Sequence, residues 1–152
     1  MSGVFEFEMQ SSVSIRATPE AVWEVLTAAS DWPRWCRVCV DVARAPEAWA
    51  VGARLGFRLR MAGVSVPFTV AITASGPPKR LAWESTKFTV TATRTFTLEV
   101  AGGTTVVTDH KLFRSQVLPV RLFYPRWIIR NMTESWLSDL KREVESRRAG
   151  NR

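Results

Sequence analysis

The chain has 152 residues, of which 46% are hydrophobic and 23% charged, and its formal net charge is +7. These values predict one ordinary globular domain, over residues 1–152, with a sizeable core. Two cysteines exclude a disulfide framework, and no apolar stretch approaches the roughly 20 residues that cross a bilayer. The first ten residues lack a basic region followed by an apolar run, so we expect no signal peptide and a cytoplasmic location.

The first 35 residues predict one strand followed by two short helices. Residues 5–15 alternate apolar and polar side chains, a period of two that is typical of a half-buried strand. Thr18 is a good N-cap, and Pro19 is well placed as the first residue of the helix that follows. Residues 31–35 predict a second short helix or turn, whose two tryptophans are available to fold inward.

Six further strands are predicted in the middle of the chain, because apolar and polar side chains alternate and Gly/Pro turns separate the runs. The clearest run has threonines on one face and Arg94 among apolar side chains on the other. Pro67 lies on the polar face of an earlier run and hints at an edge or a bulge. Turns of hairpin length favour an antiparallel sheet. The runs are 38–43, 53–61, 64–73, 81–86, 87–100 and 104–113.

The period changes in the last segment, which predicts one long helix from about residue 120 to residue 148. Pro125 falls within its early turns and should start or kink it. The apolar faces of the strands must be covered, so we expect an α+β fold in which a curved antiparallel sheet of about seven strands grips this helix. The apolar stripe of the helix consists of Ile129, Met132, Trp136, Leu137, Leu140 and Val144.

This order of elements, together with four phrases, resembles the START-like superfamily, also called SRPBCC or helix-grip, and in particular its polyketide cyclase/dehydrase-like branch. The phrases are VSIRATPEAVWEVLTAASDWPRW, PPKRLAWES, RTFTLEVAGGTTVVTDHKLF and LSDLKREVES, and the resemblance covers essentially the whole chain. It implies a deep cavity between the sheet and the last helix, which holds lipids, polyketides, steroids or other apolar ligands. Many members are binding proteins without enzymatic activity, so the resemblance alone does not imply a reaction.

A cavity is also expected from the residues themselves, because one helix cannot fill so wide a sheet with its side chains. Its volume should be roughly several hundred Å³, as is usual for apolar sites. The tryptophans at positions 35, 83 and 136 either fill the core or line this cavity. The predicted ligand-contacting residues are Trp35, Phe57, Leu59, Phe68, Val70, Trp83, Arg94, Phe96, His110, Ile129, Met132 and Trp136.

Arg94 is the most informative of these residues, because it lies on the apolar face of the clearest strand. A buried guanidinium without a partner is very costly. Its partner could be Glu84, Asp109 or an anionic group on a ligand, since the planar fork of arginine suits a carboxylate or phosphate. A salt bridge within the sheet, or a position open to water at the end of the barrel, would explain Arg94 equally well.

His110 is the only histidine, and it follows Asp109 on the last predicted strand. Alternate residues face opposite sides of a sheet, so only one of the two faces the cavity, and a bulge would reverse the choice. An inward His110 could act as a general base, whereas an outward one would be a surface residue. No nucleophile elbow of the GxSxG type accompanies it.

Cys36 and Cys39 form a CxxC motif in a context that favours two small core residues. A redox motif needs its first cysteine at a helix N-terminus, and this motif enters a predicted strand. A zinc site would need two further ligands. We therefore expect no metal and no cofactor.

The positive charge is concentrated near the C-terminus: residues 111–152 hold 10 Lys+Arg and 4 Asp+Glu, which is +6 of the +7. This excess is either a solvated helix face or a surface that makes transient contact with anionic membranes. Nucleic-acid binding is not expected, because no recognition motif is present. The residues that would make the membrane contact are Arg121, Arg126, Trp127, Ile128 and Arg130.

Three functions remain open from the sequence. The first is binding, for transport or sequestration, of an apolar or amphipathic small molecule such as a lipid or polyketide, with Arg94 orienting an acidic end. The second is a polyketide aromatase/cyclase type of enzyme, in which Arg94 stabilises enolate charge and Asp109 or His110 moves protons. The third is an accessory protein that acts through its basic C-terminal helix.

Overall fold

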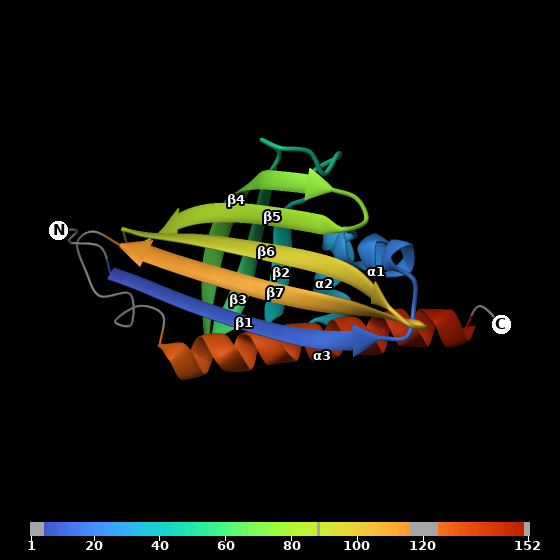
Figure 1. Ribbon diagram of the computed structural model, residues 1–152. Coiled ribbons are helices and arrows are strands. Elements are labelled where there is room, and N and C mark those ends of the chain that lie inside the picture. The colour runs from blue at the N-terminus through green and yellow to red at the C-terminus, as the bar shows by residue number, and fades with distance from the viewer. Residues whose placement is uncertain (1–4, 88, 116–124, 151–152) are drawn as a thin grey trace.

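The computed structural model describes residues 5–87, 89–115 and 125–150. Its elements form a strand, two short helices, six strands and one long helix, in the predicted order (Figure 1). The bounds are β1 (Phe5–Ile15), α1 (Pro19–Leu26), a 3-10 turn (Ala29–Asp31), α2 (Trp32–Trp35), β2 (Cys39–Arg44), β3 (Arg54–Met61), β4 (Val64–Gly76), β5 (Arg80–Lys87), β6 (Val90–Ala101), β7 (Thr104–Ser115) and α3 (Arg126–Gly150).

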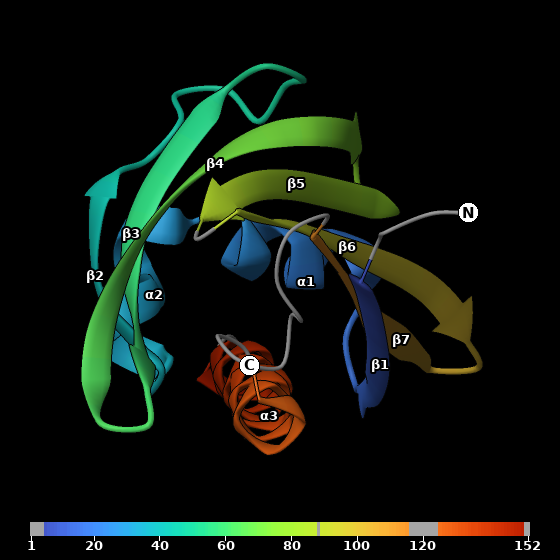
Figure 2. The same ribbon diagram turned by 90° about the vertical axis from the view of Figure 1, so that its left-hand side faces the viewer.

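The seven strands form one antiparallel sheet in the order β1-β7-β6-β5-β4-β3-β2. Consecutive strands are neighbours throughout, except that β1 joins the sheet beside β7. Viewed along α3, the sheet arches over this helix from β2 on one side to β1 on the other (Figure 2). The predicted fold, a curved sheet that grips a C-terminal helix, is confirmed.

A proline stands at the start of α1 and directly before α3. The Thr18 hydroxyl accepts a hydrogen bond of 3.2 Å from the backbone N–H of Ala21, and Pro19 opens α1. Helix α3 begins at Arg126, directly after Pro125, whose ring fixes φ and lacks an N–H. The predicted earlier start, at residue 120, lies outside the described residues.

The apolar stripe of α3 faces the sheet as predicted, but two polar residues are buried with it. Thr133 and Asp139 are both 0% exposed. Asp139 accepts hydrogen bonds from the backbone N–H of Arg37 at 2.8 Å and from its Nε at 3.1 Å, and a further one from Arg142. This carboxylate therefore ties the segment after α2 to the long helix.

Replacement of Asp139 by alanine is expected to lower the free energy of unfolding by about 1–3 kcal/mol, because the backbone N–H of Arg37 would lose its acceptor. Urea denaturation followed by tryptophan fluorescence measures this change. Glu134→Ala, on the exposed face of the same helix, is the control and should change stability by no more than about 0.5 kcal/mol. An Asp139→Ala variant as stable as this control would show that the anchor contributes nothing.

Strand β4 leaves β5 partway along its length. The two strands pair from Ala71 with Glu84 to Gly76 with Arg80, whereas β4 pairs with β3 from Val64 onwards. Pro67 lies in the part of β4 that has no partner on the β5 side, which suits a residue without an N–H donor. The sheet therefore opens between β4 and β5 above the first turns of α3.

An aromatic cluster fills the middle of the interior. Trp32 is 0% exposed and donates its indole N–H to the Leu26 carbonyl at 3.1 Å. Its ring lies 5.0 Å from that of Trp136 and 5.8 Å from those of Phe57 and Trp83. These large side chains occupy space that α3 alone would have left empty.

Candidate ligand-binding site

Two adjoining cavities lie between the sheet and the N-terminal half of α3. The larger has a volume of about 80 Å³ and the smaller about 30 Å³, and they share Leu59, Arg94, Lys111, Ile129 and Met132. The larger one sits where β4 leaves β5. Its other lining residues are Phe57, Met61, Phe68, Val70, Trp83, Ser85, Ala92, Thr93 and Phe113, and those of the smaller are Val38 and Trp136.

A buried ion pair forms one wall of these cavities. Arg94 is 8% exposed and Asp109 0%. Arg94 Nε lies 3.1 Å from Asp109 Oδ1, and Arg94 Nη2 lies 2.6 Å from Asp109 Oδ2, so the carboxylate accepts two parallel hydrogen bonds. Of the partners considered from the sequence, Asp109 is therefore the one that Arg94 takes.

Aromatic rings hold the guanidinium in place. The Arg94 Cζ atom lies 4.4 Å from the Trp136 ring centroid and 4.5 Å from that of Phe96. Such contacts stabilise a cation and restrict its orientation. The indole N–H of Trp136 is buried and has no hydrogen-bond partner among the described residues.

Lys111 brings a second cation to the same wall, directly opposite Arg94 across β6 and β7. Its side chain is only 13% exposed. The Nζ atom donates to Thr133 Oγ1 on α3, and it lies 3.4 Å from Asp109 Oδ2. Two cations thus share one carboxylate, which leaves the cluster with an excess of positive charge whenever Lys111 is protonated.

The pKa values of this cluster reflect that imbalance. Burial and the neighbouring Arg94 lower the pKa of Lys111 to about 7, and Asp109 offsets only part of this shift. Burial alone would raise the pKa of Asp109, but Arg94 and Lys111 outweigh it, so the pKa of this carboxyl is lowered. Asp109 is therefore ionised near neutral pH, whereas Lys111 can gain or lose its proton there.

Most of the predicted contact residues meet around the two cavities, but Trp35, Phe96 and His110 do not. Trp35 packs against Trp136, with ring centroids 6.0 Å apart, and lies behind the cavity wall. Phe96 is 0% exposed beneath the Arg94 guanidinium. Both are core residues. The residues that line a cavity as predicted are Phe57, Leu59, Phe68, Val70, Trp83, Arg94, Ile129, Met132 and Trp136.

The predicted position of His110 was wrong. In the register of β6 with β7, Asp109 faces the interior, so His110 faces the outer side of the sheet. There its Nε2 lies 2.5 Å from Glu8 Oε2 on β1. The histidine is an outer-face residue with a carboxylate partner, and it does not touch either cavity.

The predicted cavity size was also wrong. A volume of about 80 Å³ is well below the roughly 300–1,000 Å³ of a typical small-molecule site. The tryptophan cluster around Trp32 is the reason, because it fills the centre of the sheet and confines the free space to one end. Phe68, Ala92 and Met132 are only half-buried, so the wall at this end is in contact with solvent.

The two cysteines have the properties of core residues. Both are free and buried. Burial raises the pKa of the Cys36 thiol to about 11 and that of Cys39 to about 12, so neither provides a thiolate at neutral pH. Within the described ranges, no group of three or more His, Cys, Asp or Glu side chains could hold a metal ion.

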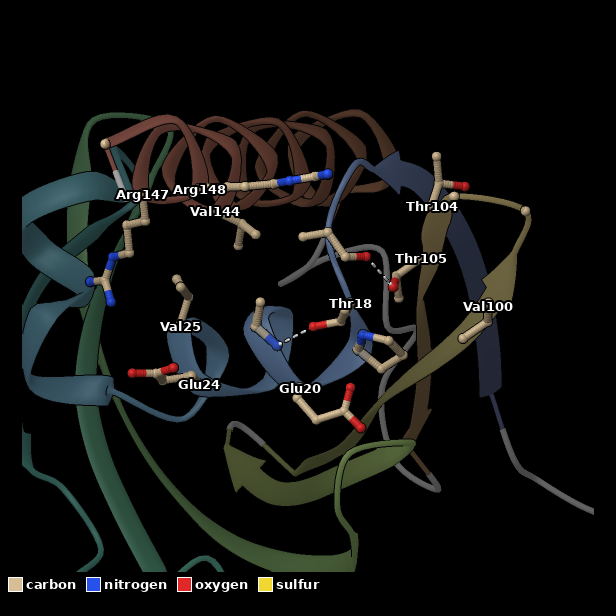
Figure 3. Close-up of a pocket in the computed structure, with 16 residues that line it drawn as sticks. Thr18, Glu20, Glu24, Val25, Val100, Thr104, Thr105, Val144, Arg147 and Arg148 are labelled. Atoms are coloured by element: carbon tan, nitrogen blue, oxygen red, sulfur yellow. Dashed lines mark hydrogen bonds between the residues drawn. The ribbon is translucent and has the colours of Figure 1, made fainter. Parts of the chain in front are cut away.

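A larger hollow of about 880 Å³ lies at the opposite end of the molecule, between α1, the β6–β7 turn and the end of α3 (Figure 3). Its polar groups are mostly engaged within the protein: Thr18 caps α1, Thr105 donates to the Ala17 carbonyl, and Arg147 pairs with Glu143. We therefore place the candidate site at the cavities beside Arg94, where a charged cluster meets apolar walls.

Sequence reasoning missed several residues of the site, of which Lys111 and Thr133 matter most. A signal for Lys111 was present, since it lies two residues after Asp109 and must share its face of the strand. Thr133 adjoins Met132 on the buried side of the helix. The other missed residues are Val38, Met61, Ser85, Ala92, Thr93 and Phe113.

The positive charges of α3 are largely paired within the protein. Lys141 pairs with Glu145, Arg142 with Asp139, and Arg147 with Glu143. Trp127, at the first turn of α3, is 64% exposed, whereas Arg121 lies outside the described residues. Among the described residues, no helix is both long and apolar enough to span a bilayer. Contact with anionic membranes stays a prediction.

The seven-stranded antiparallel sheet curved around the long C-terminal helix is a helix-grip fold. A family model described as "Polyketide cyclase / dehydrase and lipid transport" matches residues 6–145. The chain belongs to this family. Among curated proteins, none matches the chain in sequence.

Solved structures share the fold at low sequence identity. The Zhui aromatase/cyclase from Streptomyces sp. R1128 is 13% identical, with a TM-score of 0.78 over 93% of this chain and 95% of that one. A START superfamily protein from Mycobacterium smegmatis is 13% identical, with a TM-score of 0.73 over 91% and 97%. Major latex-like protein 151 from Panax ginseng is 10% identical, with a TM-score of 0.76 over 91% and 97%.

Proposed function

We propose that this protein binds a small apolar molecule with an oxygen-bearing end in the cavities between the sheet and α3. The observation that carries the proposal is the charged cluster of Arg94, Asp109 and Lys111 in a wall that is otherwise mostly apolar. Burial of a second basic group, Lys111, beside Arg94 is costly. Contact between Lys111 and a bound ligand would explain why it lies there.

Lys111, rather than Arg94, would orient the ligand. The guanidinium already gives two hydrogen bonds to Asp109 and lies against two rings, so its arrangement is fixed. The apolar part of the ligand would contact Phe57, Phe68 and Met132. The methionines at 61 and 132 can change rotamer at little cost, which would enlarge the cavity on binding.

Similarity to aromatase/cyclases supports a second candidate, catalysis on a poly-keto chain. The specific observation in its favour is Lys111, whose pKa of about 7 suits proton transfer near neutral pH. Binding is the requirement that both candidates share, so it is the property to test first.

Ala92→Trp is expected to weaken binding of 2-naphthol by at least about tenfold, because the indole would fill the cavity. Isothermal titration calorimetry measures the affinity of this apolar hydroxyl probe. The matched control is Ala101→Trp, the same change at an exposed position on the same strand, which should leave the affinity unchanged. Equal binding by both variants, or no binding by the unmodified protein, would contradict the proposal.

A further inference from the structure

The amine of Lys111 has two acceptors and a free third position. Thr133 Oγ1 donates its own proton to the Ile129 carbonyl at 2.7 Å, so it can only accept from Lys111. Asp109 Oδ2 accepts the second N–H at 3.4 Å. Among the described residues no further partner faces Nζ, and Lys111 lines both cavities. The third position of the nitrogen is therefore available to a ligand.

A neutral amine fits this arrangement better than an ammonium ion. The neutral form has two N–H bonds, which Thr133 and Asp109 accept, and one lone pair. The charged form would carry a third N–H without an acceptor in the described structure, which is costly in a buried site. The charged groups that face Lys111 are Arg94 from β6 and Asp109 from β7, and α3 contributes only the Thr133 hydroxyl.

We propose that Lys111 forms an imine with a ketone or β-diketone bound in these cavities. The amine nitrogen would bond to the carbonyl carbon, and the carbonyl oxygen would take up the two amine protons and leave as water. The Arg94 guanidinium lies beside this position and would stabilise negative charge that develops on the oxygen. This inference rests on the proposed binding function and specifies the chemical class of the ligand.

The electrostatics of the site favour the reaction. A lysine becomes nucleophilic near neutral pH when it is desolvated or placed beside another cation, and Lys111 meets both conditions. Burial and Arg94 lower its pKa to about 7. At that pH only about one in 2,500 ordinary lysine amines is neutral. Among the other lysines, Lys79 is exposed, and Lys141 pairs with Glu145 while 38% of its side chain is exposed, so neither is desolvated as Lys111 is.

The test is reaction with acetylacetone, a small β-diketone whose imine rearranges to a stable conjugated enaminone. The full-length protein is incubated with the reagent at pH 7, and the adduct is located by peptide mapping with mass spectrometry. We expect Lys111 to react at least about tenfold faster than any other lysine, with loss of one water per adduct. Peptide mapping also separates this product from reaction at the N-terminal amine.

Two variants and one competitor sharpen the result. Lys111→Met should abolish the fast adduct, whereas Lys79→Arg, which changes an exposed lysine, should not affect it. Excess 2-naphthol should slow the modification if both molecules occupy the same cavities. Because the unmodified protein alone shows which lysine reacts, the test does not depend on the folding of any variant.

The outcomes separate the two proposals. If 2-naphthol binds but Lys111 reacts no faster than the other lysines, imine formation is wrong and the binding function stands. If neither binding nor a selective adduct is found, both are wrong. A fast adduct on Lys111 that 2-naphthol slows supports both.

Discussion

Replacement of Asp109 by asparagine is expected to lower the free energy of unfolding by about 3–5 kcal/mol. The carboxylate is 0% exposed and is the common partner of Arg94 and Lys111. An amide in its place carries no charge and cannot accept both parallel hydrogen bonds from Arg94. The buried Arg94 guanidinium would then lose its counter-charge, and protonation of Lys111 opposite it across β6 and β7 would become more costly still.

Urea denaturation of Asp109→Asn measures this effect, and Asp41→Asn is the matched control. Asp41 pairs with Arg58 on the surface, where 45% and 47% of the two side chains are exposed, so its loss should cost no more than about 1 kcal/mol. The double variant Arg94→Met/Asp109→Leu should be more stable than Asp109→Leu alone, because it removes the stranded guanidinium. Equal losses for Asp109→Asn and Asp41→Asn would contradict the importance assigned to the buried pair.

The second large effect is a dependence of stability on pH that arises from Lys111. Its pKa is about 7 in the folded protein and near 10.4 in an unfolded chain, so between these values the folded state holds fewer protons. The free energy of unfolding therefore rises with pH in this window, and the contribution is lost as the pH falls through about 7. From pH 7 to 8.5 the gain should reach up to about 2 kcal/mol.

The measurement compares the unmodified protein with Lys111→Met in urea at several pH values between 7 and 8.5. The free energy of unfolding of the variant should not show the rise that arises from Lys111. The value for the unmodified protein minus that for the variant should therefore increase with pH. Higher pH is avoided because of Cys36 and Cys39, whose pKa values are raised by burial in the folded protein. At higher pH these thiols ionise in the unfolded chain but not in the folded protein, which lowers the free energy of unfolding. Parallel curves for the two proteins would mean that Lys111 titrates normally.

Local patterns in the sequence predicted the fold well because each of them has a direct physical cause. Alternation in residues 5–15 reflects a strand with one buried face, and Thr18 and Pro19 start a helix through a hydrogen bond and a fixed φ. Pro125, which was expected to start or kink the last helix, directly precedes the first residue of α3. These features depend on neighbours in sequence, so they do not need the tertiary structure.

The site was harder to predict because it depends on register and packing. Whether Asp109 or His110 faces inward is decided by the pairing of β6 with β7, which alternation alone leaves open. Once Asp109 faces inward, Lys111 must do so too, and the cluster with Arg94 follows. The cavity volume depends on how Trp32 and its neighbours pack, and no local pattern contains that information.

The small cavity has a consequence for the choice of ligand. Since the open volume is about 80 Å³, a large lipid would require extensive movement of the wall, whereas a small keto compound would require only rotamer changes. The position of Lys111 also means that the polar end of the ligand would lie deep in the protein, against β7 and α3. The apolar end would then point toward the half-buried Phe68 and Met132.

The most direct test of the binding site uses methionine methyl groups as reporters in a titration with 2-naphthol followed by NMR. The chain has four methionines, and Met61 and Met132 line the cavity, whereas Met9 on β1 does not. We predict that the Met61 and Met132 methyl signals shift strongly and that the Met9 signal shifts less. If the probe binds while these two signals stay in place, it occupies another part of the molecule, and the assignment of the site is wrong.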